Sequence, residues 1–261
     1  MAQPYESLEA ELHDLFWHAA DNLTEVGLMA KFLSMFPGKA LEIGSGSGRL
    51  LLPLREQGFE IEGLELSNRM RELALTESRK RAIEICQHKG DMATWQPPHE
   101  FHSLLVPAFT LQLADDPWRV LDHWISWLTD IGGIYLSVFK PVAEISGDLP
   151  ENTWYDDHEI MLDGSRNALL RTRHVLNHSE QSLIREHHYQ VAASPPQEHR
   201  STQQLVWFEV QQLRTALEAR GFEIIHLFHD FDLNFTVPTP SLHDYSGVTT
   251  VWARRTSEAG I

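Results

Sequence analysis

The sequence predicts an α/β protein: a mostly parallel sheet with helices on both faces, preceded by helices and carrying an inserted antiparallel β cap. Three observations support this prediction. Strand-like and helix-like segments alternate between residues 39 and 139, which is typical of a parallel sheet covered on both faces. A glycine-rich turn stands between the first strand and the first helix of that series. From residue 142 to 208, the helical pattern gives way to alternating stretches separated by turns, which favours antiparallel strands.

The individual elements follow from periodicity and end signals. Apolar residues recur at helical spacing over residues 5–36, which predicts two helices that end before Pro37-Gly38. Ser67 is the expected N-cap of the helix over 68–81, and Gly221 is the expected C-cap of the helix over 209–220. The other helices are expected over 47–57 and 116–129. The main-sheet strands are expected over 39–43, 59–65, 83–88, 102–106, 133–139, 222–229 and 247–254, and the insert strands near 158–163, 168–178, 182–193 and 198–208. The core then comprises residues 1–141 and 209–261, and the insert comprises 142–208.

Composition and charge restrict the partners. The chain has 261 residues and a formal net charge of −16, and such a surface repels nucleic acid, whose binding requires neutralised phosphates. No apolar stretch approaches the length of a membrane span, and the first residues lack the form of a signal peptide. The single cysteine, Cys86, is expected to be an inert residue of a core strand. One cysteine allows no intramolecular disulfide, which favours a cytoplasmic location. We therefore expect a small-molecule substrate, with no nucleic acid and no membrane as partner.

The turn at residues 40–48 reads Ala-Leu-Glu-Ile-Gly-Ser-Gly-Ser-Gly. A strand that turns through glycines into a helix brings backbone N–H groups and a positive helix end to a ligand. A dinucleotide-binding turn would have its third glycine at the position of Arg49, whereas here it is Gly48. Glu42 would also repel a pyrophosphate but suits a cation. S-adenosylmethionine (SAM) is such a ligand, since it carries a sulfonium and an ammonium and no phosphate; an NAD-dependent oxidoreductase is disfavoured.

Two further acids follow at expected strand ends. Glu65 lies about twenty residues after the glycine turn, where an acid accepts hydrogen bonds from ribose hydroxyls. Asp91 can receive the adenine amino group, and Met92 can pack on the adenine ring. Ligands of parallel sheets bind at the carboxyl ends of the strands, where these residues are expected. The predicted cofactor contacts are Glu42, Gly44, Ser45, Gly46, Gly48, Glu65, Leu66, Asp91, Met92, Pro107 and Phe109.

These motifs resemble those of the class I SAM-dependent methyltransferases. Residues 41–50, Leu-Glu-Ile-Gly-Ser-Gly-Ser-Gly-Arg-Leu, are similar to the first family motif, and residues 63–70 to the second. Residues 105–112 and 132–141 are similar to the fourth and fifth strands. The resemblance is weakest over 142–205 and closest to the small-molecule branch, which includes amino-sugar and glycine N-methyltransferases. It implies a Rossmann-like seven-stranded sheet and in-line transfer of a methyl group from SAM, leaving S-adenosylhomocysteine, to a small nucleophile, with nitrogen favoured over sulfur and then oxygen.

Departures from that branch point to histidines. Sugar N-methyltransferases resemble Asn-Ser-Leu-Gln-His-Leu after the fourth strand, with His as a candidate base, but here Leu113 occupies that position. His13 stands where relatives have a tyrosine that reaches the cofactor; an exposed helical histidine beside Asp14 is an equally weighted alternative. His187 is expected to share a strand face with Arg185 and Tyr189. The candidates are His13, His174 and His187 for catalysis, and Tyr5, Trp17 and Arg173 for substrate binding.

Two alternatives concern metals and activity. His226 and His229 lie near Asp230 and Asp232, but strand alternation puts the two histidines on opposite faces, which is poor ligand geometry, so no metal is expected. For any single histidine of the insert, a surface or hydrogen-bonded residue is favoured over a site role. A non-catalytic SAM-binding module that regulates a partner is the alternative function, because its glycine turn would look the same.

Overall fold

The computed structural model describes residues 5–16, 19–107, 109–163, 167–232 and 247–256. Seven strands form the main sheet in the order β10-β11-β5-β4-β1-β2-β3. Every neighbouring pair is parallel except the two pairs made by β11, which runs antiparallel to β5 and β10. The strands are β1 (Ala40–Ile43), β2 (Ile61–Glu65), β3 (Gln87–Lys89), β4 (Phe101–Val106), β5 (Leu128–Lys140), β10 (Phe222–His229) and β11 (Gly247–Arg255). The predicted Rossmann-like sheet is confirmed.

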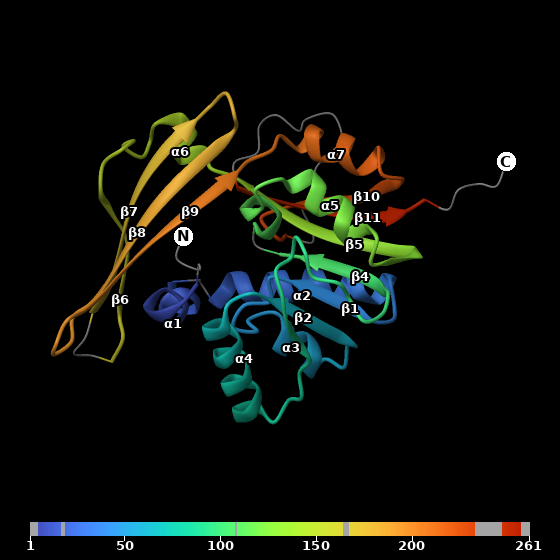
Figure 1. Ribbon diagram of the computed structural model, residues 1–261, viewed down its shortest axis with the longest axis horizontal. Coiled ribbons are helices and arrows are strands. Elements are labelled where there is room, and N and C mark those ends of the chain that lie inside the picture. The colour runs from blue at the N-terminus through green and yellow to red at the C-terminus, as the bar shows by residue number, and fades with distance from the viewer. Residues whose placement is uncertain (1–4, 17–18, 108, 164–166, 233–246, 257–261) are drawn as a thin grey trace.

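Helices cover both faces of this sheet. Figure 1 shows α5 and α7 on one face and α2, α3 and α4 on the other. The helices are α1 (Ser7–Phe16), α2 (Ala19–Met35), α3 (Leu51–Glu56), α4 (Asn68–Arg81), α5 (Pro117–Ile125), α6 (Val142–Ser146), α7 (Val210–Glu218) and the 3-10 helix η1 (Thr110–Leu113). Ser67 caps α4 as predicted, since its hydroxyl accepts from the Met70 N–H at 3.1 Å. None of the helices in the described part of the chain combines the length and apolar character that crossing a bilayer requires.

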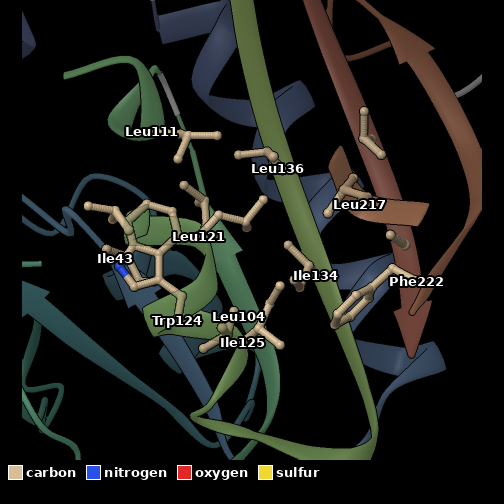
Figure 2. Close-up of a cluster of buried hydrophobic side chains, with 14 of the residues drawn as sticks. Ile43, Leu104, Leu111, Leu121, Trp124, Ile125, Ile134, Leu136, Leu217 and Phe222 are labelled. Carbon is tan, nitrogen blue, oxygen red and sulfur yellow. The ribbon is translucent and has the colours of Figure 1, made fainter. Parts of the chain in front are cut away.

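Two apolar layers hold the helices to the sheet. On the α5–α7 face, Trp124 and Leu121 pack with Leu217 and with strand residues such as Ile134, all of them buried (Figure 2). On the other face, the ring of Phe32 in α2 meets that of Tyr135 in β5 edge-on at 5.9 Å between centroids. Burial of this kind is the dominant favourable term in folding, so the cores fix the sheet whose strand ends carry the predicted site.

The second sheet lies within residues 142–208 and contains four antiparallel strands in the order β6-β7-β8-β9. They are β6 (Tyr155–Met161), β7 (Asn167–Asn177), β8 (Ser182–Val191) and β9 (Gln197–Val206). Leu8 and Leu12 of α1 pack against Leu170 and Tyr189 on one face of this sheet. Figure 1 shows the sheet at one end of the molecule, with α1 beside it and near α4. Helix α1 also contacts the glycine turn, where Asp14 accepts from the Ser47 hydroxyl, so it connects the turn to the insert. We call the face of the insert sheet that α1 covers the inner face.

Four predicted elements differ clearly from the structure. The strand predicted over 83–88 is only Gln87–Lys89, and Cys86 precedes it and is exposed rather than buried in a core strand. The helix predicted over 116–129 ends at Ile125, and β5 begins already at Leu128. Gly133, where the strand was predicted to begin, lies inside β5 and serves close packing: a Cβ there would lie 2.8 Å from the Phe36 ring. The helix predicted over 47–57 begins at residue 51, because the glycine turn continues to residue 50.

Candidate active site

A cavity of about 480 Å³ lies at the carboxyl ends of β1, β2 and β3; we call it the loop cavity. Its volume is within the range of small-molecule sites. The glycine turn forms one wall, and the segments after β3 and β4 form others. Of the predicted cofactor residues, Glu42, Gly44, Ser45, Gly46, Glu65, Leu66, Asp91, Met92 and Pro107 line it. Residues far apart in the sequence thus meet at the edge of the sheet formed by the carboxyl ends of its strands.

The glycines of the turn have different tasks. Gly44 and Gly46 have φ values of +74° and +53°, in the left-handed region that favours glycine. A Cβ on Gly44 would also lie 2.8 Å from the Thr110 hydroxyl, so the turn can approach η1 only without a side chain. Gly48 does not line the loop cavity but faces helix side chains, since a Cβ on it would lie 3.2 Å from Leu52 and 3.4 Å from Ala74. Gly48 therefore serves helix packing, and its contact with the cofactor stays a prediction.

Glu65 organises the backbone around the cavity. One carboxylate oxygen accepts from the Gly46 N–H at 2.9 Å, and the other accepts from the Ser67 N–H at 2.7 Å. Burial raises the pKa of Glu65, although these two hydrogen bonds act in the opposite direction. Asp91 is exposed at the far wall, where one of its oxygens accepts from the Ala93 N–H at 2.8 Å. Each carboxylate still has lone pairs for a ligand.

Glu42 gives the cavity a buried acid. Its side chain belongs to a residue that is 2% exposed, and among the described residues its Oε2 has no hydrogen-bond partner. Burial raises the pKa of Glu42 well above its usual value; Arg49 acts against this shift, while Glu25 and Glu65 add to it. A buried acid oxygen without a partner is costly. A cationic ligand would supply the missing partner, so the donor set fits SAM.

A second cavity, also of about 480 Å³, lies between α1, the inner face of the insert sheet and the β10–β11 end; we call it the insert cavity. Tyr5 and His13 line both cavities, so the two meet at these side chains. The insert cavity has aromatic, acidic and basic groups in its wall, among them Glu9, Arg185 and His187. A ligand in the loop cavity and a second one in the insert cavity would therefore be neighbours.

His13 is held by a carboxylate. Its Nδ1 lies 2.9 Å from one oxygen of Asp14, and the other oxygen accepts from the Ser47 hydroxyl at 2.5 Å. Burial opposes the charge of Asp14, but the hydrogen bonds from His13 and Ser47 prevail and lower its pKa. Since the carboxylate accepts, Nδ1 carries the proton and the lone pair of a neutral ring lies on Nε2. The glycine turn, through Ser47, thus helps to orient this histidine.

Tyr5 ties three parts of the molecule together. Its hydroxyl oxygen accepts from Gln203 of β9 at 2.7 Å, and its carbonyl accepts from the Ser67 hydroxyl at 2.7 Å. Its ring meets the His13 ring edge-on at 5.5 Å between centroids. Burial, with Glu9 and Glu65 acting in the same direction, raises the pKa of Tyr5, so the phenol stays neutral. It therefore presents an uncharged aromatic surface where the cavities meet.

His187 is part of a chain of hydrogen bonds on the inner face. The Thr172 hydroxyl donates to Asp157 at 2.7 Å and lies 3.3 Å from His187 Nδ1. Because that hydroxyl gives its proton to Asp157, it accepts from Nδ1–H, and the ring lone pair is on Nε2. Burial lowers the pKa of His187 to about 4, with the positive charge of Arg185 acting in the same direction and Asp157 against it. His187 is therefore neutral near pH 7.

A family model described as a methyltransferase domain matches residues 16–227, most of the chain. The chain belongs to this methyltransferase family. Three solved structures share its fold: a SAM-dependent methyltransferase from Clostridium acetobutylicum ATCC 824, the CcbJ methyltransferase from Streptomyces caelestis, and the sugar N-methyltransferase KedS8 from Streptoalloteichus sp ATCC 53650. Their TM-scores are 0.76, 0.74 and 0.71, and their sequence identities are 11%, 18% and 20%. The matches cover 94%, 97% and 98% of this chain and 96%, 98% and 97% of those chains, respectively. No match is found among curated proteins.

The class I SAM-dependent methyltransferase predicted from the sequence is thus confirmed in family and fold. In this methyltransferase Leu113 stands where sugar N-methyltransferases have a candidate base. It lines the loop cavity and packs with Leu183, Leu205 and Trp207 of the insert region. A leucine there closes the space between η1 and the insert. It leaves His13 as the histidine that lines both cavities among the described residues.

Three predicted site residues have a different setting, and a fourth lies outside the described residues. His174 is fully buried on the inner face and lies outside both cavities, so a direct catalytic contact has no support. Arg173 points to the opposite face, where it pairs with Glu186, so it does not reach a substrate in either cavity. Phe109 lines the insert cavity rather than the loop cavity and packs on Phe139 at 4.7 Å between ring centroids. Trp17 lies outside the described residues.

Several residues of the methyltransferase site were missed from the sequence. Glu9 is buried, lines the insert cavity and accepts from the Tyr5 N–H and the Ser201 hydroxyl, both at 2.8 Å. Gln203 and Thr172 reach the site across strand pairs. Alternation along the strands could have placed Thr172 on the face of His174, but only the packing of α1 identifies that face as the inner one.

Proposed function

We propose that this methyltransferase transfers a methyl group from SAM, bound in the loop cavity, to a small amine bound in the insert cavity. The observation that carries the proposal is the pair of adjoining cavities that share Tyr5 and His13. Methyl transfer requires a donor and a nucleophile in line and shielded from water, and adjoining sites provide this arrangement. The segment 142–208 is then the acceptor-binding unit of the protein.

Three acidic residues that line the loop cavity would bind SAM. Glu65 would accept from the ribose hydroxyls, Asp91 from the adenine amino group, and Glu42 would face the positive charge. When bound, SAM supplies a methyl group on a positively charged sulfur, activated for in-line displacement. The N–H groups of the glycine turn and the ring of Tyr5 complete the enclosure.

His13 is assigned as the general base. An amine that gains a methyl group must lose a proton, and Nε2 is the basic atom of the ring when Asp14 holds Nδ1. His187 is less suited to take the proton, because its pKa is about 4 and Arg185 is nearby. Its neutral ring is instead assigned to accept a hydrogen bond from the acceptor and orient it.

The wall of the insert cavity favours a small polar amine such as an amino sugar. Glu9 contributes a carboxylate that would attract an ammonium group, Gln203 contributes an amide, and the rings of Phe16 and Tyr189 give flat surfaces for a sugar ring. KedS8, a sugar N-methyltransferase of the same fold, is consistent with this class. Nitrogen is therefore favoured as the acceptor atom, ahead of sulfur and oxygen.

The test is turnover with a panel of acceptors. Purified protein is incubated with SAM and amino sugars, other small amines, thiols and alcohols of matched size, and release of S-adenosylhomocysteine is measured by mass spectrometry. Methylation of one or more amines in preference to their hydroxyl analogues is expected. SAM binding without turnover across the whole panel would favour a SAM-binding regulatory module. A thermal shift produced by NAD but not by SAM would overturn the cofactor assignment.

A further inference from the structure

Four potential metal ligands gather away from both cavities, at the edge of the main sheet. Glu62 is near the start of β2, Cys86 directly precedes β3, His88 is in β3, and His99 shortly precedes β4. In the parallel pairing of β2 with β3, Gly63 is opposite Gln87 and Leu64 is opposite His88. Since side chains alternate, Glu62, Cys86 and His88 project from the same face of the sheet. None of the four lines the loop cavity or the insert cavity.

Three of the four residues place their ligand atoms close together, and His99 joins them through Glu62. The carboxylate, Sγ and imidazole nitrogen of Glu62, Cys86 and His88 all lie within 4.8 Å of one another. His88 Nε2 is 2.6 Å from one oxygen of Glu62 and 3.7 Å from Cys86 Sγ. His99 Nε2 is 3.1 Å from the other oxygen of Glu62. The side chains of Glu62, His88 and His99 are 16%, 23% and 30% exposed, so these three are partly shielded from solvent, while Cys86 is exposed.

The contacts of His99 leave a place for a cation. Its Nδ1 is 3.1 Å from the Glu100 carbonyl oxygen, while Nε2 faces the Glu62 carboxylate. Both partners can only accept, whereas a neutral imidazole has one N–H to donate. The second contact therefore needs either a second proton on the ring or a cation between Nε2 and the carboxylate. A ring nitrogen whose partner nitrogen donates to a carbonyl is the usual state of a metal-binding histidine.

We propose that Glu62, Cys86, His88 and His99 form a structural site for a divalent metal of the zinc class. Thiolate, imidazole and carboxylate together suit Zn²⁺, and four protein ligands make a closed tetrahedral site. Bond lengths of roughly 2.0–2.3 Å put the ligand atoms of such a site about 3.3–3.6 Å apart. The Cys86–His88 and Glu62–His99 separations are near these values, and the Glu62–His88 pair must open by roughly 0.7 Å. The expectation of no metal concerned His226, His229 and the nearby Asp230 and Asp232, which are not part of this cluster.

The site would fasten the outermost strand. Strand β3 has three residues and pairs only with β2 in the described sheet, so it has few backbone bonds of its own. The His88 ring also packs on the Trp95 ring at 5.0 Å, and the Trp95 N–H donates to the Asp91 carbonyl at 2.8 Å. A metal here would therefore stabilise the segment that carries Asp91 in the loop cavity. A cysteine binds metal as the thiolate, so binding at Cys86 should release a proton and strengthen as the pH rises.

The test uses the full chain without an affinity tag, stripped of metal with a chelator that is then removed. Calorimetric titration with Zn²⁺ should show one equivalent bound, and the melting temperature should rise with Zn²⁺ concentration. Cys86→Ser and His88→Gln should each weaken Zn²⁺ binding at least tenfold, as loss of even an outer partner does in known sites. Co²⁺ should give the intense visible bands of a tetrahedral site and a thiolate charge-transfer band that Cys86→Ser abolishes.

His178→Gln is the matched control, because His178 is an exposed histidine on the distant β7–β8 turn. It should bind Zn²⁺ like the unchanged protein. Circular dichroism, measured on every variant, reports whether the variant is folded and depends on neither SAM binding nor methyl transfer. The proposal is overturned if no saturable single site is found, if the folded Cys86→Ser variant binds Zn²⁺ unchanged, or if His178→Gln weakens binding as much as His88→Gln does.

Discussion

The loop cavity and the insert cavity have similar volumes but are built in different ways. The loop cavity is made by segments that follow consecutive strands, and backbone groups hold its key acid: the N–H groups of Gly46 and Ser67 both donate to Glu65. The insert cavity is made by side chains that come together across several strands, as Thr172 and His187 do. A cavity built from backbone groups can bind the same cofactor whatever side chains surround it. A cavity built from side chains is specific for the acceptor that those side chains fit. We therefore expect changes in the two cavities to affect different kinetic constants.

The largest effect is expected where the two cavities meet. His13→Ala should lower kcat roughly 10²–10³-fold, because general-base assistance is lost. SAM affinity should change much less than kcat, since the hydrogen bond from Ser47 to Asp14 at the glycine turn does not involve the ring. Single-turnover kinetics and calorimetry measure the two quantities. Asp14→Asn keeps the ring but removes the charge that orients it, so a smaller loss with a shifted pH–rate profile is expected; an unchanged kcat in His13→Ala would refute the assignment.

The next effect separates the cavities. Glu65→Ala should weaken SAM binding by about 3 kcal/mol, on the order of a hundredfold, because charge-assisted hydrogen bonds to the ribose are lost. Glu65→Gln, which keeps the shape, should lose less. Calorimetry gives the affinity, and circular dichroism shows whether the variant is folded, since Gly46 and Ser67 lose their acceptor too. Unchanged SAM affinity in a folded Glu65→Ala protein would mean that the loop cavity is not the cofactor site.

The same contrast explains why the residues of the loop cavity could be predicted from the sequence and the arrangement of the insert cavity could not. The loop cavity depends on local signals: an acid at the end of a strand and glycines where φ is positive, so Glu42, Gly44 and Gly46 were found from the chain alone. The insert cavity depends on which face of β7 and β8 is covered by α1. Alternation correctly grouped His187 with Arg185 and Tyr189, since their partners across the strand pair share one face, but it could not say which face is inner.

A moderate effect is expected from the insert alone. His187→Gln should raise the KM of the acceptor about tenfold, the cost of roughly one hydrogen bond, while SAM affinity does not change. Steady-state kinetics with the acceptor varied at saturating SAM test this. His199→Gln, a change on the neighbouring strand outside the residues that line the cavity, is the control. A loss of SAM affinity in His187→Gln would contradict the proposal that SAM binds in one cavity and the acceptor in the other.

A smaller effect concerns pH and Glu42. Burial raises the pKa of Glu42 in the folded protein, so the folded state holds this proton to higher pH than the unfolded state does. Its contribution to stability without ligand is present at low pH and is lost as the pH rises through the folded pKa. SAM should act in the opposite direction: a cation favours the ionised acid, so SAM affinity should rise with pH over the same range. Calorimetry at several pH values should show this rise in the unchanged protein and a flatter dependence in Glu42→Gln; equal slopes would exclude Glu42 as the partner of the charge.

The smallest effect should come from the outer face of the insert sheet. Arg173 pairs with Glu186 there, both side chains are about one-third exposed, and the guanidinium lies 5.3 Å from the Trp154 ring centroid. Such exposed pairs contribute about 0–1 kcal/mol to stability. Arg173→Ala should therefore leave kcat, acceptor KM and SAM affinity unchanged and lower the free energy of unfolding by at most about 1 kcal/mol, measured by urea denaturation. Because residue 172, its neighbour on β7, faces inward, Arg173→Ala and Thr172→Val form a matched pair on opposite faces of one strand. If Arg173→Ala raises the acceptor KM as much as Thr172→Val does, the acceptor does not bind on the inner face alone, and the insert cavity is not the whole of its site.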